Sequence, residues 1–203
     1  MKNFFLKSRI ILIVFFIFIT LKSNSGISAE KYEDILIGDR SSPIKIIVYS
    51  SLTCPHCANF HINVLPKIKK HYIDKKKVIV ILKDFPLDVA ALNASKLIQC
   101  VEKTRKLELI DEIYESQKIW TDGNTIEEIN KNLITIGKKY NLNKNIINQC
   151  FENDSLEEWI LNSRISAQKK YDIRATPTII INEKKFDGVI NFETMNKKIK
   201  KLI

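Results

Sequence analysis

The sequence contains no internal repeat and no low-complexity tract, and after residue 19 it has no apolar run that approaches the length needed to span a membrane. Repeat architectures are therefore excluded, and the later part of the chain is expected to be soluble. Its 203 residues are enough for one ordinary domain with a sizeable hydrophobic core.

Aromatic residues are absent from the short basic runs at residues 75–77 and 197–201, although the chain carries a net charge of +10. Sites that bind single-stranded nucleic acid combine basic side chains with aromatic rings on which bases stack. We therefore interpret the scattered lysines as a solvated surface, and we expect no nucleic-acid partner.

A leader-like segment opens the chain. The apolar run IILIVFFIFI, residues 10–19, follows the basic residues Lys2, Lys7 and Arg9 and precedes a stretch that ends in small residues at Ala29. This layout predicts a secretory signal peptide over residues 1–29, with an uncleaved membrane anchor as the alternative. The leader holds four of the 33 basic residues and none of the 23 acidic ones, which leaves a net charge of +6. We expect the mature chain to be exported to a compartment where disulfides persist.

Strand patterns near both ends of the mature chain enclose a helical region. β-branched and apolar runs predict strands at 33–37, 44–50, 78–82 and 178–182, the last with a short partner around Phe186. Residues from about 88 to 171 show five helical stripes and no strand pattern. Apolar residues at every fourth position predict a helix directly after the strand at 44–50, and a last helix starts near Phe192. The order of elements predicts an α/β fold.

Two of the four cysteines stand two residues apart, in SLTCPHCANFH, where the strand at 44–50 has ended. Pro55 suits the first position of a helix, so Cys54 becomes the N-cap and its sulfur faces the free N–H groups of the first turn. These groups, together with His56 when it is protonated, favour the thiolate of Cys54 and make it the sulfur that attacks or is attacked. Cys57, one turn further on, should be more buried and less acidic, and would resolve a mixed disulfide.

Metal binding and inert packing are the alternatives for this pair. Cys54, Cys57 and His61 could supply three zinc ligands with a remote His71 as the fourth, but the chain has no second Cys-X-X-Cys pair. We expect His61 to face solvent and His71 to be an ordinary residue late in the helix. Asp84 could be a buried proton acceptor, but the sequence alone does not assign it to the site.

A second motif, RATPTIII, lies at residues 174–181 and places Pro177 just before the returning strand. Proline has no N–H to donate to a strand ladder, so it leaves an edge free for a bound chain. A plain turn proline is the alternative.

Four features follow one another along the chain: SSLTCPHC between a strand and a helix, DFPL at 84–87, a helical block, and ATPT before a strand. In this order they resemble the DsbA family of thioredoxin-fold thiol–disulfide oxidoreductases. The resemblance extends over residues 33–203. It implies a single domain, residues 30–203, with a thioredoxin fold and a helical insertion at about 88–171, between the second core strand and the cis-proline hairpin. It also implies that Cys54 and Cys57 form the redox-active disulfide, and that Pro177 is the cis-proline facing them, with Thr176 before it.

The resemblance further implies an activity without a bound cofactor or metal. Members of the family donate a disulfide to reduced, newly exported proteins in the periplasm, and a DsbB-like membrane quinone reductase reoxidises them. Thr176 is common in relatives that isomerise disulfides, so an isomerase or a reductase stays open. Residues 30–43 are too few for the dimerisation domain of known isomerases, which favours an oxidase. A metal-binding protein or a chaperone is the alternative from another class.

The other two cysteines, Cys100 and Cys150, fall on the first and fourth helices of the predicted insertion. Both positions resemble ones where some members of the family carry cysteine. We therefore expect a structural disulfide that clamps the insertion, with two buried free thiols as the alternative.

Overall fold

A five-stranded sheet forms the centre of residues 32–203, the part of the chain that this computed structural model describes. The predicted signal peptide lies outside these residues. The strands are β1 (Ile35–Ile37), β2 (Ile44–Ser50), β3 (Val78–Asp84), β4 (Thr178–Ile181) and β5 (Lys184–Lys185). Their order across the sheet is β1-β3-β2-β4-β5, and β2 and β3 are parallel while the other neighbours are antiparallel. The α/β thioredoxin fold expected from the sequence is confirmed.

The register of the two central strands determines where the site forms. β2 and β3 pair from Ile44 with Val78 through to Ser50 with Asp84, so both strands end at the same edge of the sheet. The chain leaves β2 at this edge and enters the CPHC segment four residues later. Asp84 is thereby brought close to the cysteines, although it lies 27 residues after Cys57 in the sequence.

Different helices cover the two faces of the sheet because side chains alternate along β2. Ile46 and Val48 belong to an apolar cluster with the helix after the CPHC segment and with α10 (Phe192–Lys200). Ile47 and Tyr49 belong to a second cluster, which includes residues of α9 and the segment that follows it. Since all four side chains are buried, β2 is a central strand covered on both faces.

A single long helix follows Cys54, with two wider turns in it. Its segments are α2 (Pro55–Asn59), the π-helical turn η1 (Phe60–Val64), α3 (Leu65–Ile68) and the π-helical turn η2 (Lys69–Ile73). Pro66 has no N–H to donate to the carbonyl of Ile62, which accounts for a wider turn next to it. The four residues of the predicted apolar stripe are all buried against the sheet: Phe60, Val64, Ile68 and Tyr72.

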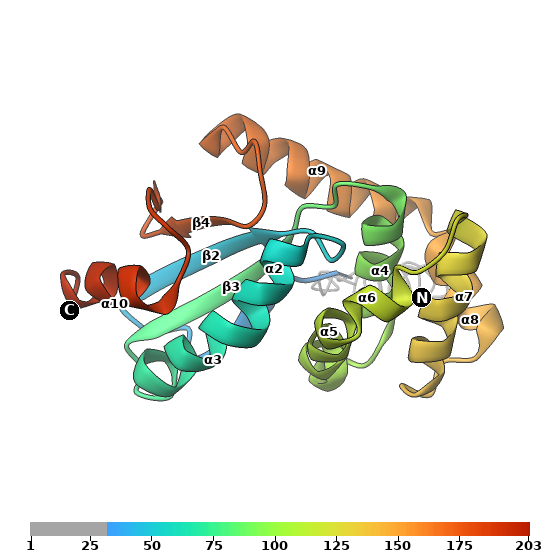
Figure 1. The fold of residues 1–203 in the computed structure, drawn as a ribbon, viewed down its shortest axis with the longest axis horizontal. Helices are drawn as coiled ribbons and strands as arrows, with labels where there is room; N and C mark the ends of the chain where they lie inside the picture. Colours follow the sequence, from blue (N-terminus) through green and yellow to red (C-terminus); the bar gives the residue numbers. More distant parts are fainter. Residues whose placement is uncertain (1–31) are drawn as a thin grey trace, which may run out of the picture. The chain divides into compact units, whose positions relative to one another are not determined.

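The helical insertion follows β3 and DFPL. Its elements are α4 (Val89–Cys100), the 3₁₀ turn η3 (Lys103–Arg105), α5 (Lys106–Glu115), α6 (Gln117–Trp120), α7 (Ile126–Lys138), α8 (Lys144–Phe151) and α9 (Asp154–Tyr171). Figure 1 shows α4 to α8 grouped beyond one end of the sheet, while α9 runs from this group back toward β4. Helices α4, α7, α8 and α9 begin at side chains that accept from a backbone N–H of the first turn: Asp88, Thr125, Asn143 and Asn153.

The returning hairpin starts one residue after Pro177. The Thr176–Pro177 peptide bond is cis, and β4 pairs antiparallel with β2. β5 covers Lys184–Lys185, slightly before the predicted partner around Phe186, but the Phe186 N–H still donates to the Ile179 carbonyl at 2.8 Å. Among residues 32–203, none of the helices combines the length and apolar character that a membrane crossing requires.

Candidate active site

Cys54 is the N-cap of the helix, as the CPHC spacing predicts. Its backbone is extended, with φ −80° and ψ 121°, and Pro55 occupies the first turn. The Cys54 carbonyl accepts from the N–H groups of Cys57 at 3.0 Å and Ala58 at 3.1 Å. Its side chain therefore stands at the positive end of the helix, beside N–H groups that have no partner within the helix.

The cis-proline segment faces the first cysteine. The Cys54 Sγ donates to the Thr176 carbonyl at 3.3 Å, across a separation of 122 residues. The structure therefore brings Cys54, Cys57, Thr176 and the cis Pro177 into one site. Pro55 and His56 lie beside it on the first turn of the helix with exposed side chains.

The two sulfurs have opposite acidities. A hydrogen bond from the Cys57 thiol lowers the pKa of Cys54 to about 5, and Thr176 and the backbone N–H groups of Cys57 and His56 add to this effect. Burial raises the pKa of Cys57, and its interaction with the Cys54 sulfur raises it further. Cys57 is only 1% exposed, against 9% for Cys54. The asymmetry has the expected direction, and His56 contributes to it through its backbone N–H.

Side chains from the insertion hold the loop before the helix. The Gln117 Nε2 on α6 donates to the carbonyl oxygens of Leu52 at 2.7 Å and Cys54 at 3.2 Å. The Thr53 hydroxyl donates to the Asp88 carboxylate at 2.7 Å. Sequence reasoning missed Gln117, because it only ends a weak helical stripe over residues 110–117 and its partners lie more than 60 residues away.

A small cavity lies behind Cys57. Its volume is about 20 Å³, which is room for one water molecule, and its walls include Cys57, His61, Asp84 and Tyr114. Burial raises the pKa of the Asp84 carboxyl to about 6, although the Ser95 hydroxyl donates to it at 2.7 Å and opposes the shift. Asp84 thus faces the less acidic cysteine with a carboxyl group that exchanges its proton closer to neutral pH than an ordinary aspartate does.

The prediction that His61 faces solvent is wrong. His61 lies four residues after Cys57, on the same side of the helix, and α5 packs over it, so it is only 6% exposed. Its Nε2 is 2.6 Å from the Asp111 Oδ1, and its ring lies 4.7 Å from the ring of Tyr114. No local sequence pattern indicates this burial, because the covering helix lies 50 residues further along the chain.

His71 lies far along the same helix, where its ring packs 5.1 Å from the ring of Phe192. This agrees with its interpretation as an ordinary residue late in the helix. Within residues 32–203, no group of three or more histidine, cysteine, aspartate or glutamate side chains is arranged to hold a metal ion. The zinc alternative therefore has no ligand set among the described residues.

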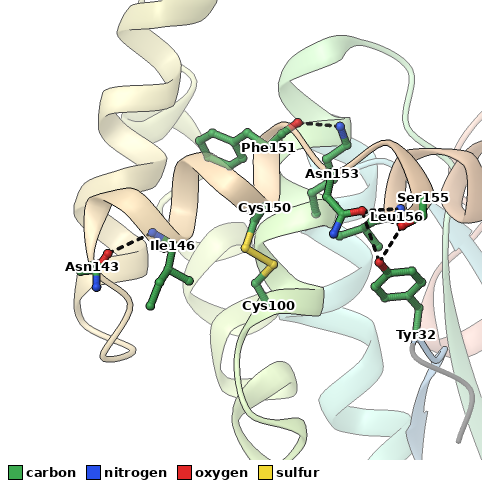
Figure 2. The surroundings of a disulfide bond; sticks show 10 residues. Tyr32, Cys100, Asn143, Ile146, Cys150, Phe151, Asn153, Ser155 and Leu156 are labelled. Carbon is green, nitrogen blue, oxygen red and sulfur yellow. Dashed lines mark hydrogen bonds between the residues drawn. A yellow bond between two sulfur atoms is a disulfide. The ribbon is translucent and has the colours of Figure 1, made fainter.

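A disulfide joins Cys100, at the end of α4, to Cys150 in α8, with an S–S distance of 2.03 Å (Figure 2). Next to it, the buried Lys96 ammonium on α4 donates to the Phe151 carbonyl at 2.7 Å and forms an ion pair with Glu157 on α9. The first helix of the insertion is therefore tied both to α8 and to the start of α9.

Three features define a thioredoxin-fold protein with a dithiol site. They are a central parallel strand pair, a Cys-X-X-Cys motif at a helix N-terminus, and a cis-proline segment that contacts the first cysteine. A family model described as thioredoxin matches residues 30–201. The crystal structure of Wolbachia pipientis alpha-DsbA1 is 33% identical, with a TM-score of 0.76, over 84% of this chain and 90% of that one. The chain belongs to the thioredoxin family and is of the DsbA type.

Two further relatives mark the range of this similarity. A Rickettsia conorii protein, provisionally named a protein-disulfide oxidoreductase, is 28% identical over 150 residues, which are 73% of this chain and 53% of that protein. The chain thus spans about half the length of the curated relatives that it matches first. A protein-disulfide isomerase from Novosphingobium aromaticivorans shares the fold with a TM-score of 0.77, over 84% of this chain and 98% of that one, at 18% identity.

Proposed function

We propose that this protein is an exported thiol–disulfide oxidoreductase that donates the Cys54–Cys57 disulfide to reduced proteins. The observation that carries the proposal is the opposite acidity of the two sulfurs at one helix N-terminus. The names of its relatives, alpha-DsbA1 and protein-disulfide oxidoreductase, point to the same chemistry.

Two exchange steps account for the reaction. A substrate thiolate attacks the Cys54 Sγ, a substrate–Cys54 disulfide forms, and the Cys54–Cys57 bond breaks with its electron pair on Cys57. Cys57 then takes up a proton, because its pKa is raised. A second substrate thiolate attacks the substrate sulfur, and Cys54 leaves as the thiolate. The substrate loses two electrons and the cysteine pair gains them.

The stabilised thiolate sets the direction of transfer. A low pKa of Cys54 favours the reduced pair, so the disulfide form is a strong oxidant; DsbA is the standard example of this relation. The same low pKa makes Cys54 a good leaving group in the second step. These properties favour disulfide donation over reduction.

The proposal includes the setting of the reaction. The mature domain, from about residue 30, would follow cleavage of the leader and work in the periplasm. Its substrates would be unfolded or reduced exported proteins, which bind as an extended chain along the edge at Pro177, and a DsbB-like membrane quinone reductase would reoxidise the pair. The reaction needs no bound cofactor, because sulfur itself carries the electrons.

The test is an equilibrium titration of the Cys54–Cys57 pair against glutathione, with disulfide donation to a reduced model protein measured alongside. We expect a potential well above that of the glutathione couple, and donation that Cys54→Ser abolishes. Cys57→Ser should instead trap substrates as mixed disulfides, because the resolving thiol is missing. Cys100→Ser/Cys150→Ser is the matched control and should still donate.

Normal donation by Cys54→Ser would refute the proposal. A potential as low as that of thioredoxin would instead assign the pair to reduction or isomerisation.

A further inference from the structure

Disulfide exchange moves protons as well as electrons, and one of these protons belongs to a buried group. If the pair works as proposed above, Cys57 takes up a proton each time the disulfide is donated and loses it each time the disulfide is restored. Cys57 is 1% exposed, so its sulfur exchanges protons poorly with bulk water. A path from Cys57 to the surface is therefore required.

The cavity behind Cys57 has a histidine in its wall. His61 and Asp84 both line this cavity, from the helix and from the end of β3 respectively. The histidine lies one helical turn after Cys57 and is 6% exposed. A buried imidazole that shares a cavity with a buried thiol and a half-buried carboxyl is a suitable carrier of protons.

The far side of this imidazole reaches water. Its Nε2 is 2.6 Å from the Asp111 Oδ1, and the Asp111 side chain is 53% exposed. The pair therefore has one end in the cavity wall and the other at the surface. The ring of Tyr114 packs against the imidazole and holds its orientation.

Few titratable groups face His61. From α5 these are Asp111 and Tyr114, from α2 Cys57, and from β3 Asp84 and Lys83, the last paired with Asp34. Burial keeps the pKa of Tyr114 far above neutral, so its hydroxyl does not lose a proton in the working range. The acid–base groups on the path are therefore the thiol, the two carboxyls and the imidazole.

We propose that the His61–Asp111 pair carries the proton of Cys57 between the cavity and solvent. When the disulfide is restored, Cys57 gives its proton to the Asp84 carboxylate, its sulfur bonds to the Cys54 sulfur, and the partner's thiolate leaves with the electron pair. Asp84 passes the proton to the His61 Nδ1, and the proton on Nε2 moves to Asp111 and from there to water. Donation of the disulfide runs the path in reverse. His61 and Asp111 thus affect the exchange only indirectly, through the proton of Cys57.

The test is the rate at which Cys57 closes a mixed disulfide between Cys54 and glutathione, followed across the pH range in the purified protein. We expect His61→Gln to slow closure by about tenfold or more near neutral pH and to change the shape of the pH profile. The reason is that Asp84, the general base, can no longer pass its proton to the imidazole. Asp111→Asn, at an exposed position, should give the same change with little effect on folding.

Two controls separate proton transfer from structure. His71→Gln removes an exposed imidazole from the same helix and should leave the rate and its pH profile unchanged. In His61→Ala, added imidazole should restore the rate, which a purely structural loss would not allow. The ultraviolet titration of the Cys54 thiolate should match the wild type in His61→Gln and Asp111→Asn.

Closure by His61→Gln and Asp111→Asn at the wild-type rate and pH profile would overturn this inference, as would His61→Ala that imidazole fails to restore. Either result would leave the proposed function intact, provided that the wild type donates disulfides. Failure of the wild type itself to exchange with glutathione would instead refute the proposed function.

Discussion

At the scale of the single residue, Cys54 illustrates how position alone separates an acidic thiol from a weakly acidic one. Its neighbour Cys57 has the same side chain, three residues away, and yet the pKa values of the two move in opposite directions. The difference comes from position: one sulfur stands at the N-terminus of a helix and the other is buried one turn further on. Local sequence is sufficient to predict this, because Pro55 indicates where the helix begins.

This asymmetry makes the stability of the reduced protein depend on pH. The folded-state pKa of Cys54, about 5, lies below the value of about 8.5 for an exposed cysteine, so the thiolate favours the folded state. The contribution is fully present above about pH 8.5 and is lost as the pH falls through about 5. Urea unfolding should therefore show that reduced wild type is stabilised relative to reduced Cys54→Ser at high pH. This difference in unfolding free energy should shrink as the pH falls from about 8.5 to about 5.

Comparison with Cys54→Ser cancels the opposite effect of Asp84, whose pKa is raised to about 6. That carboxyl stabilises the fold below about pH 4, and its contribution disappears as the pH rises through 6. A difference between the two proteins that stays constant with pH would contradict the assignment of the shift to Cys54.

At the scale of helices and strands, the site depends on contacts that the sequence pattern does not contain. The strands, the helix after Cys54 and the helical block are all predictable from apolar periodicity. Gln117 ends a weak apolar stripe at residues 110–117, but its importance comes from its side-chain amide, which donates to two carbonyls of the loop before the helix. Such a contact joins two elements that pack together only in the folded chain.

Gln117→Ala should therefore disturb the active-site loop more than the insertion itself. The buried Leu52 carbonyl loses a donor, which costs about 1–3 kcal/mol of unfolding free energy, while the Cys54 carbonyl keeps the N–H groups of Cys57 and Ala58. We expect a shift in the thiolate titration of Cys54, because the loop before the helix is no longer fixed. Chemical unfolding and the thiolate absorbance measure the two effects. Lys118→Ala, at an exposed position of the same turn, is the control and should change neither.

At the scale of the whole molecule, the described residues divide into a sheet with its covering helices and an insertion with its own apolar cluster. Leu52, Cys54 and Cys57 belong to the insertion's cluster, although they precede it in the chain by more than 30 residues. The active site is therefore built at the junction of the two parts. Sequence patterns predicted both parts and the two motifs, but not how the insertion packs on the CPHC segment, and this packing buries His61.

Loss of the second disulfide should act on stability rather than on the redox site. The loop between Cys100 and Cys150 spans 50 residues, for which the chain-entropy model gives about 4 kcal/mol of stabilisation. Cys100→Ser/Cys150→Ser should unfold at lower denaturant concentration by an amount of this order, with the redox potential of the Cys54–Cys57 pair unchanged. Alkylation of either cysteine in the native, unreduced protein would contradict the presence of the bond.

The Lys96 contacts beside this disulfide also bear on what holds the insertion together when the disulfide is reduced. Lys96 connects α4 to the carbonyl of Phe151 and to Glu157 through charge and hydrogen bonding alone. This non-covalent link joins the same two helices as the disulfide, and its atoms do not change when the sulfurs are oxidised or reduced. The packing of α4 against α8 therefore has two supports, and only the disulfide is broken by a reductant.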